Sequence, residues 1–412
     1  METEAQLHIR RVTANYRAVV VVASLVDFVF GATFVYHMTE IGVQPAAVGA
    51  LLAVAGIVSF ALEIPTGIIA DRIGNKRILV VGLTMWAAGQ ALFGLSTTVL
   101  AVAAGLLLLN VAQAFYSGAP VAYTVNALNR MVAGERVARV SASGVSWRWV
   151  GAAAGGATVF VLGDLVGTGL TLTISGVALL IAAGWVVFAW PPETLDRSGG
   201  LSVHIRSAWA AGFAFVVARR SWTLVAALCA LAFGQGVLVL VWQPKTLEVG
   251  ALSASTLGLV LVVLTAAAAT GSYLASRLVD TTKHWALIAS LGVMAAGLGI
   301  ASVDAAVSFA GLLLAEVGLG ASGALLAAMQ QKMFSDALRN TLTSTVAAIF
   351  TVIVGAGQLV GGAVWGSQGL AASLLVGAGV VGVIAGAVAA KEALGLGAPP
   401  RREGEPDAHE AG

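Results

Sequence analysis

The sequence predicts an all-α integral membrane protein with twelve transmembrane helices, arranged as two pseudo-symmetric six-helix bundles with both termini in the cytoplasm. Three observations support this fold class. Of the 412 residues, 58% are hydrophobic and 10% are charged, whereas about 25% of a soluble domain is charged. Long apolar runs recur along the whole chain, and the basic residues gather on one side of them.

Each half of the chain contains six apolar runs that can cross a hydrocarbon core, which needs about 20 apolar residues. The first six predicted spans cover 17–38, 46–70, 78–96, 98–118, 142–162 and 167–190. The second six cover 221–243, 254–276, 285–303, 305–328, 342–364 and 369–390. The polar amino-terminal segment lacks a short hydrophobic core with a cleavage site, so we expect no removable signal peptide.

The spans divide the chain into four predicted parts: an amino-terminal bundle over 1–190, a cytoplasmic linker over 191–220, a carboxy-terminal bundle over 221–390 and a tail over 391–412. Within the linker, residues 201–219 form a weakly amphipathic stretch that we expect to lie on the membrane surface. The tail is rich in Pro, Gly and acids, and we expect it to be disordered.

The basic residues predict the orientation. Twenty of the 22 Lys and Arg fall in the amino-terminal segment, the tail or the connections that follow even-numbered spans. Lys245 alone falls on the opposite side, and Arg148 alone falls inside a span. The positive-inside rule therefore places both termini in the cytoplasm of a multi-pass protein of the cell membrane, either plasma or inner.

Internal repetition supports two parallel six-helix repeats. Ser117-Gly118-Ala119 recurs as Ser322-Gly323-Ala324 at an offset of 205 residues. The pairs Ala70 with Arg72 and Phe28 with Gly31 recur at the same offset. One shared offset near half the chain length is typical of a duplicated bundle.

A charged hinge joins the second and third spans. It reads EIPTGIIADRIGNKR from Glu63 to Arg77, and includes Pro65, Gly67, Asp71, Arg72, Gly74 and Lys76. This pattern closely resembles the loop signature of the major facilitator superfamily (MFS) of secondary transporters, and its first part resembles the multidrug-efflux members, which are drug and proton antiporters. Asn75 departs from the family pattern, because an arginine is usual there.

The resemblance implies a gating role for the hinge and a central cavity lined by the first, fourth, seventh and tenth spans. In the family the loop packs near the cytoplasmic start of span eleven, here around Thr341 to Thr345. Asp71 would then interact favourably with a helix amino terminus and latch the halves on the inside. A solvated turn charge is the alternative for Asp71.

Four charged residues lie inside predicted spans, where a charge costs about 2.5 to 3.5 kcal/mol. Asp27 and Glu316 lie near the midplane and are the candidate proton carriers. The alternative for Asp27 is a structural ion pair. The alternative for Glu316 is a carboxylate hydrogen-bonded to Ser and Thr hydroxyls of neighbouring helices. For Arg148, we weigh snorkelling to the interface equally against a partner such as Asp27 or an anionic group. Glu63, which precedes Pro65, is expected to anchor the second span.

Polar and aromatic residues on the spans suggest a substrate cavity, although Asn and Gln can equally join helices. The candidates are Asn110, Gln113, Tyr116, Arg148, Gln235, Trp242 and Gln243. Two antiporter features of the family are missing: the arginine of span four, where Asn110 stands, and the proline of span five.

The predicted function is proton-coupled efflux of a hydrophobic or amphipathic small molecule by alternating access. One alternative is an uptake carrier for a small anionic metabolite. Another is a non-transporting receptor or assembly factor on the same scaffold. An enzyme, a metal site and a nucleic-acid partner are not expected, because no His lies mid-span and no ligand cluster or phosphate loop is present. We expect a monomer in the lipid bilayer that uses the proton gradient and no cofactor.

Overall fold

The computed structural model describes residues 4–130, 137–193, 214–249, 253–278, 284–303, 306–334 and 339–394. These ranges are almost entirely helical and contain no strand. Ten of their helices are long and apolar enough to cross a membrane. The 17-residue α10 is a shorter apolar helix, and α6 contains two of the predicted spans. The predicted all-α membrane class is confirmed.

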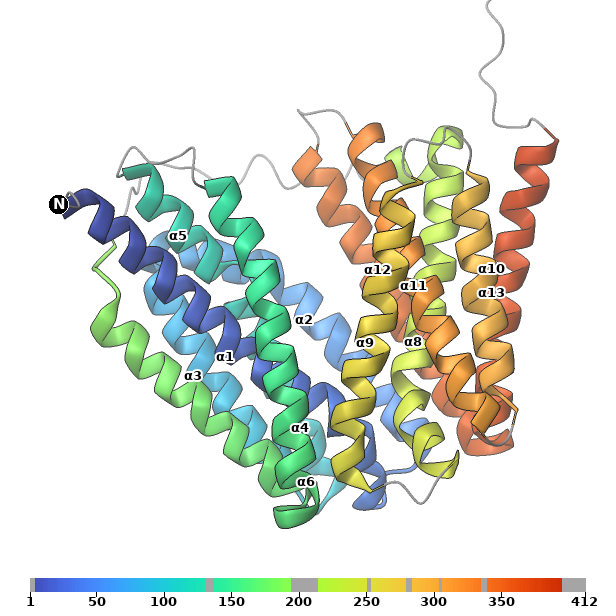
Figure 1. Ribbon diagram of the computed structural model, residues 1–412, viewed down its shortest axis with the longest axis horizontal. Coiled ribbons are helices and arrows are strands. Elements are labelled where there is room, and N and C mark those ends of the chain that lie inside the picture. Colours follow the sequence, from blue (N-terminus) through green and yellow to red (C-terminus); the bar gives the residue numbers. More distant parts are fainter. Residues whose placement is uncertain are drawn as a thin grey trace, which may run out of the picture.

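Two groups of helices, separated by the linker, build the molecule (Figure 1). The N-half contains α1 Glu4–Glu40, α2 Pro45–Ile73, α3 Asn75–Gly94, α4 Val99–Tyr116, α5 Ala119–Arg130 and α6 Val137–Ala189. After a 3-10 turn at Arg219–Ser221, the C-half contains α8 Trp222–Val249, α9 Ala254–Ser276, α10 Trp285–Ala301, α11 Ala306–Met333, α12 Arg339–Gln368 and α13 Leu370–Ala393.

Three helices differ from the predicted spans. The first begins at Glu4, so α1 extends well beyond the apolar run that starts at residue 17. The short amphipathic helix α5 occupies a connection for which no helix was expected. Predicted spans five and six are two helices, together labelled α6, that meet at Gly167, where the φ of 80° is not helical. Glycine tolerates this positive φ, so the chain reverses there without a separate loop.

The predicted linker and tail fall mostly outside the described residues. Of the stretch 201–219, only the end is described, where the ring of Phe215 packs edge-on against Phe334 at 5.4 Å. The last helix, α13, ends at Ala393, and residues 395–412 lie outside the described part. The expectations of a surface helix and a disordered tail therefore stay predictions.

The two halves meet at the end of the molecule opposite the termini. We call the side where α1 begins and α13 ends the termini face, and the other side the far face. Figure 1 shows the halves diverging toward the termini face. Near the far face, α6 packs on α9 so closely that a Cβ on Gly258 would overlap the carbonyl oxygen of Gly156. Gly49 of α2 approaches Gln358 of α12 in the same way, as small residues allow between membrane helices.

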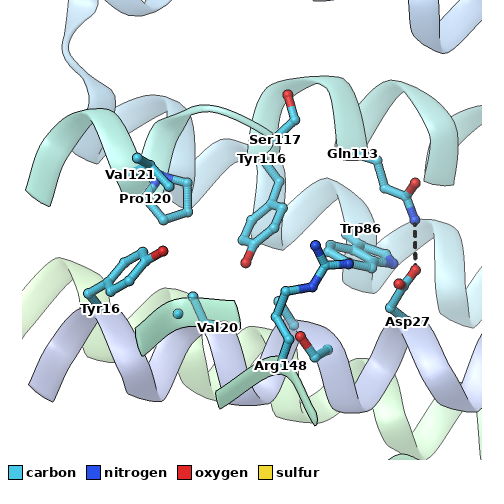
Figure 2. A pocket seen from close by; sticks show the side chains of 13 residues that line it. Tyr16, Val20, Asp27, Trp86, Gln113, Tyr116, Ser117, Pro120, Val121 and Arg148 are labelled. Atoms are coloured by element: carbon cyan, nitrogen blue, oxygen red, sulfur yellow. Dashed lines mark hydrogen bonds between the residues drawn. The ribbon is translucent and has the colours of Figure 1, made fainter. Parts of the chain in front are cut away.

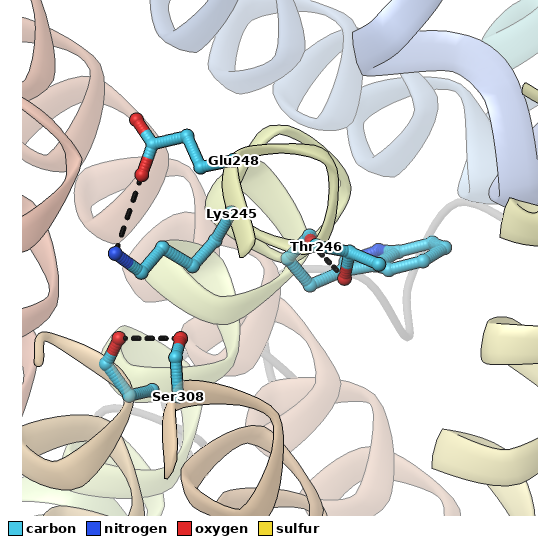
Figure 3. A network of polar contacts seen from close by, with 6 residues as sticks. Lys245, Thr246, Glu248 and Ser308 are labelled. Atoms are coloured by element: carbon cyan, nitrogen blue, oxygen red, sulfur yellow. Dashed lines mark hydrogen bonds and ion pairs between the residues drawn. The ribbon is translucent and has the colours of Figure 1, made fainter. Parts of the chain in front are cut away.

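Lys245, predicted on the far face, lies at that end of α8 but is buried, with 1% of its surface exposed. Its ammonium group forms an ion pair with Glu248 at 3.2 Å (Figure 3). Since Glu248 is half exposed, the pair stays in contact with solvent on one side. Reagents in solution are therefore expected to label Lys245 poorly, despite its position at a helix end.

A polar contact also holds the halves together at the far face. The backbone N–H of Asp164, just before the α6 kink, donates to the Ser255 hydroxyl at 2.9 Å, and the Asp164 carboxylate accepts from the Ser255 N–H at 3.2 Å. Asp164 lies in the turn between the two spans of α6. Hydrogen bonds from Ser253 and then Ser255 lower the pKa of Asp164 below its usual value.

This pKa shift sets the pH range of the contact. Because the contact lowers the pKa of Asp164, the carboxylate stabilises the contact at any pH above the free pKa of about 3.9. This stabilisation is lost as the pH falls through the lowered pKa of the folded protein. We therefore expect Asp164→Asn to leave the shape of the pH–transport profile unchanged between about pH 5 and 8. Transport measured in vesicles over this range checks it, and a shifted midpoint would contradict it.

Candidate functional site

A cavity of about 440 Å³ lies within the N-half, among α1, α3, α4, α5 and α6. Figure 2 shows its polar and aromatic side chains converging from these helices. The lining residues are Tyr16, Val20, Ala23, Ser24, Asp27, Trp86, Gln113, Tyr116, Ser117, Pro120, Val121, Gly144 and Arg148. Four of the predicted site residues, Asp27, Gln113, Tyr116 and Arg148, are thus brought together.

Asp27 projects into the cavity from the middle of α1. Its Oδ1 accepts a hydrogen bond from the Gln113 side-chain amide of α4 at a long 3.4 Å. Among the described residues it forms no ion pair, although the charge of Arg148 acts on it across the cavity. A carboxylate held by one weak hydrogen bond near a cation can exchange partners when it gains or loses a proton.

Arg148 reaches the cavity because α6 lies very close to α1. A Cβ on Gly151, one turn further along α6, would overlap the backbone carbonyl of Val21. Figure 2 shows the guanidinium group with the Tyr116 ring on one side, the Asp27 carboxylate on the other and the Trp86 ring next to it. The side chain makes no hydrogen bond or ion pair with any described residue. It is therefore placed to meet a substrate group or, in another conformation, Asp27.

Two aromatic rings form the cavity wall behind Arg148. Trp86 of α3 packs edge-on against Tyr116 at 5.4 Å between ring centroids. Trp86 is buried, and its indole N–H has no acceptor among the described residues. Sequence reasoning missed both Trp86 and Tyr16, because α3 was not expected to face the cavity and Tyr16 precedes the predicted first span. The interruption of an apolar run by a tryptophan was the available signal.

Other predicted cavity residues lie elsewhere in this conformation. Asn110 donates to the Leu106 carbonyl of its own helix at 2.9 Å. Trp242 is buried and Gln235 is half-buried, and neither lines the cavity. Gln243 is fully buried and binds the α1 backbone. These placements leave their roles in a central cavity as predictions.

Glu316 lies in the middle of α11, separated from the Asp27 cavity. It is half-buried and makes no hydrogen bond or ion pair with a described residue. Its proton-coupling role stays a prediction. The described residues hold no group of three His, Cys, Asp or Glu side chains that could bind a metal ion.

The hinge between α2 and α3 is fastened to the end of α6. Asn75 is buried, and its side chain donates to Glu193 Oε1 at 2.8 Å, while the Lys76 N–H donates to Glu193 Oε2 at 3.1 Å. The Lys76 ammonium donates to the carbonyl of Val187 in the last turn of α6 at 3.0 Å, and to that of Trp190, the residue after the helix, at 2.5 Å. Glu193 thus caps α3, and Lys76 caps α6. Asn75 therefore has a partner of its own where the family arginine is absent.

The remaining hinge residues are only partly described. The side chains of Asp71 and Thr341 and the burial of Gly67 are not described, so the predicted inner latch stays a prediction. Arg72 and Arg77 are exposed, and Gly74 has a φ of 96° that suits the turn. In α2, the hydroxyl of the buried Thr66 donates to the Ala114 carbonyl of α4 at 3.1 Å.

The Thr66 hydroxyl therefore ties α2 to α4 one turn after Glu63. Pro65 lies inside α2 as expected. Glu63 is exposed, and its side chain makes no hydrogen bond or ion pair with a described residue. The anchoring role of Glu63 stays a prediction.

The fold and the polar cavity within a membrane bundle define a membrane transport protein. Residues 18–362 match the family model of the Major Facilitator Superfamily. The chain belongs to this superfamily, and the resemblance of the hinge is confirmed at that level. These findings point to a transporter and not to an enzyme.

Over 70 residues, the chain is 33% identical to the inner membrane transport protein YajR of Escherichia coli (strain K12). The match covers 17% of this chain and 15% of that protein. It supports a local relationship and leaves activity and substrate open.

Two solved structures show the same fold over nearly the whole chain. The nucleoside transporter NupG has a TM-score of 0.75 and 15% sequence identity, covering 92% of this chain and 98% of its own. A bacterial homolog to the human lysosomal transporter Spinster, in an inward-facing and occupied conformation, has a TM-score of 0.75 and 15% identity. It covers 97% of this chain and 100% of its own.

Proposed function

We propose that this protein is a proton-coupled secondary transporter that exports hydrophobic or amphipathic small molecules. The observation that carries the proposal is a weakly bonded carboxylate, Asp27, in a membrane-embedded cavity opposite the guanidinium of Arg148, which has no hydrogen-bond partner among the described residues. Apolar and aromatic walls at Val20, Trp86 and Tyr116 suit an amphipathic solute.

The distribution of basic residues supports a cytoplasmic termini face. With that orientation, the two halves diverge toward the cytoplasmic side (Figure 1), which supports a state that opens to the cytoplasm. Rocking of the two halves about the site would then expose it to the outside. At about 100 mV, one proton entering supplies about 2.3 kcal/mol, which can concentrate a neutral solute about 50-fold.

A second candidate is uptake of a small organic anion together with a proton. The position of the Arg148 guanidinium in the cavity favours it. An anion bound to Arg148 would stabilise the protonated form of Asp27, because two negative charges close together are unfavourable. Anion and proton would then bind cooperatively and move in the same direction. A cation or neutral solute would instead compete with the proton and move in the opposite direction.

The sign of coupling distinguishes the two candidates. We expect proteoliposomes of the purified protein to move the amphipathic cation rhodamine 6G against an imposed proton gradient, with no such flux in protein-free liposomes. Accumulation of benzoate in the same direction as protons would favour anion uptake. Binding of either probe without flux would overturn both and favour a receptor or assembly factor.

A further inference from the structure

The side-chain amide of Gln243 joins the two halves through the backbone of α1. Its Nε2 donates to the Gly31 carbonyl at 2.8 Å, and its Oε1 accepts from the Tyr36 N–H at 2.8 Å. Gln243 lies on α8 and is fully buried, with an exposed fraction of 0%. Both polar groups of one side chain are therefore satisfied by the main chain of the opposite half.

These contacts compete with the hydrogen bonds of α1 itself. In a regular α-helix the Tyr36 N–H would donate to the carbonyl of Ala32, four residues earlier. The same N–H donates to Gln243 Oε1, so this side chain competes with the Ala32 carbonyl for one proton. The affected segment begins four residues beyond Asp27 on the same helix.

Because Gln243 is buried, its two hydrogen bonds to α1 are expected to form together or break together. The amide is buried away from solvent. Gly31 faces Leu261 of α9, whose Cδ2 would lie 3.6 Å from a Cβ added at Gly31. A small separation of the halves would break both hydrogen bonds without admitting water, which is unfavourable for a buried amide. A large separation would hydrate Gln243 and return the Tyr36 N–H to Ala32.

We propose that Gln243 is a positioning residue that latches the far face closed by exchanging hydrogen bonds with α1. In the closed state the amide is paired with Gly31 and Tyr36. In the open state the amide is hydrated and α1 regains its own hydrogen bond. The latch goes beyond the proposed function, because it requires neither a particular substrate nor proton coupling.

The proposal is tested by measuring distances between spin labels in the full-length protein in lipid nanodiscs, without substrate or proton gradient. In a Cys229→Ala background, Thr97→Cys with Val303→Cys reports on the far face, and Ile73→Cys with Ser276→Cys reports on the termini face. All four label positions lie at exposed helix ends or connections. We expect Gln243→Met, which removes both hydrogen bonds at similar length, to raise the population open at the far face about tenfold.

Gln90→Met is the matched control. Gln90 is also fully buried, but it donates to the Ser175 hydroxyl at 3.2 Å within the N-half. We expect this variant to keep the wild-type distances. If Gln243→Met also keeps them, the latch is overturned.

A second variant covers a failure of Gln243→Met to fold, as judged by size-exclusion chromatography. Gln243→Asn keeps the amide but is one methylene shorter, so it cannot reach both α1 groups at once. We expect it to shift the same populations in the same direction, and unchanged populations in Gln243→Asn would overturn the proposal.

Discussion

Asp27→Asn is expected to abolish proton-driven accumulation of substrate while leaving substrate exchange intact. Asparagine keeps the size of the side chain and can still interact with Gln113, but it cannot carry a proton. The expected loss is the whole gradient that one proton can support, about 50-fold at 100 mV. Accumulation in proteoliposomes with an imposed proton gradient measures it.

Exchange of labelled for unlabelled substrate, without a gradient, is the internal control for folding and binding in the same vesicles. Glu316→Gln is the comparison variant, because Glu316 lies on α11 outside the described cavity. If Glu316 carries a second proton, this variant should lose only part of the dependence on voltage. Asp27→Asn vesicles that still accumulate substrate would show that Asp27 is not the proton carrier.

Gly258→Val is expected to lower the transport rate about tenfold or more by preventing closure of the far face. A Cβ at this position would overlap the Gly156 carbonyl oxygen, so α6 and α9 would have to move apart. Forcing extra atoms into a packed contact costs about 1 to 3 kcal/mol. Transport assays, with the Thr97 and Val303 spin labels reporting the far-face distance, measure the effect.

Gly292→Val provides the control for placing valine at a helical glycine. Gly292 lies on α10, is exposed, and has nothing within 4 Å of an added Cβ. We expect it to transport at close to the wild-type rate. If Gly258→Val transports at the wild-type rate and keeps the far-face distance, close packing of Gly258 on Gly156 is not needed for transport.

The spans could be predicted from the sequence because a membrane helix needs a long apolar run, which is a local property of the chain. The helix α5 was missed for the same reason, since its 12 residues are amphipathic and too short to cross. The kink at Gly167 was missed because a single glycine does not distinguish a sharp turn from a loop. These misses concern connections, where length and hydropathy carry little information.

The site was only partly predictable because it depends on how each helix is rotated about its axis. Asp27 and Arg148 were found because buried charges are rare in membranes. Trp86 was missed and the contact of Gln243 with the α1 backbone was not foreseen, because neutral side chains on apolar helices look alike whether they face lipid, substrate or another helix. Glu193 was missed because its partners, Asn75 and Lys76, lie more than 100 residues away in the chain.

The continuity of α6 across the membrane has a mechanical consequence. Arg148 and Asp164 lie 16 residues apart before the kink at Gly167, which is about 24 Å along the axis of a rigid rod. Tilting such a lever by about 10° around its Asp164 end displaces its Arg148 end by about 4 Å. Loosening the Asp164–Ser255 contact would therefore shift the guanidinium relative to the rest of the cavity, so that the cavity and the far-face contact would move together.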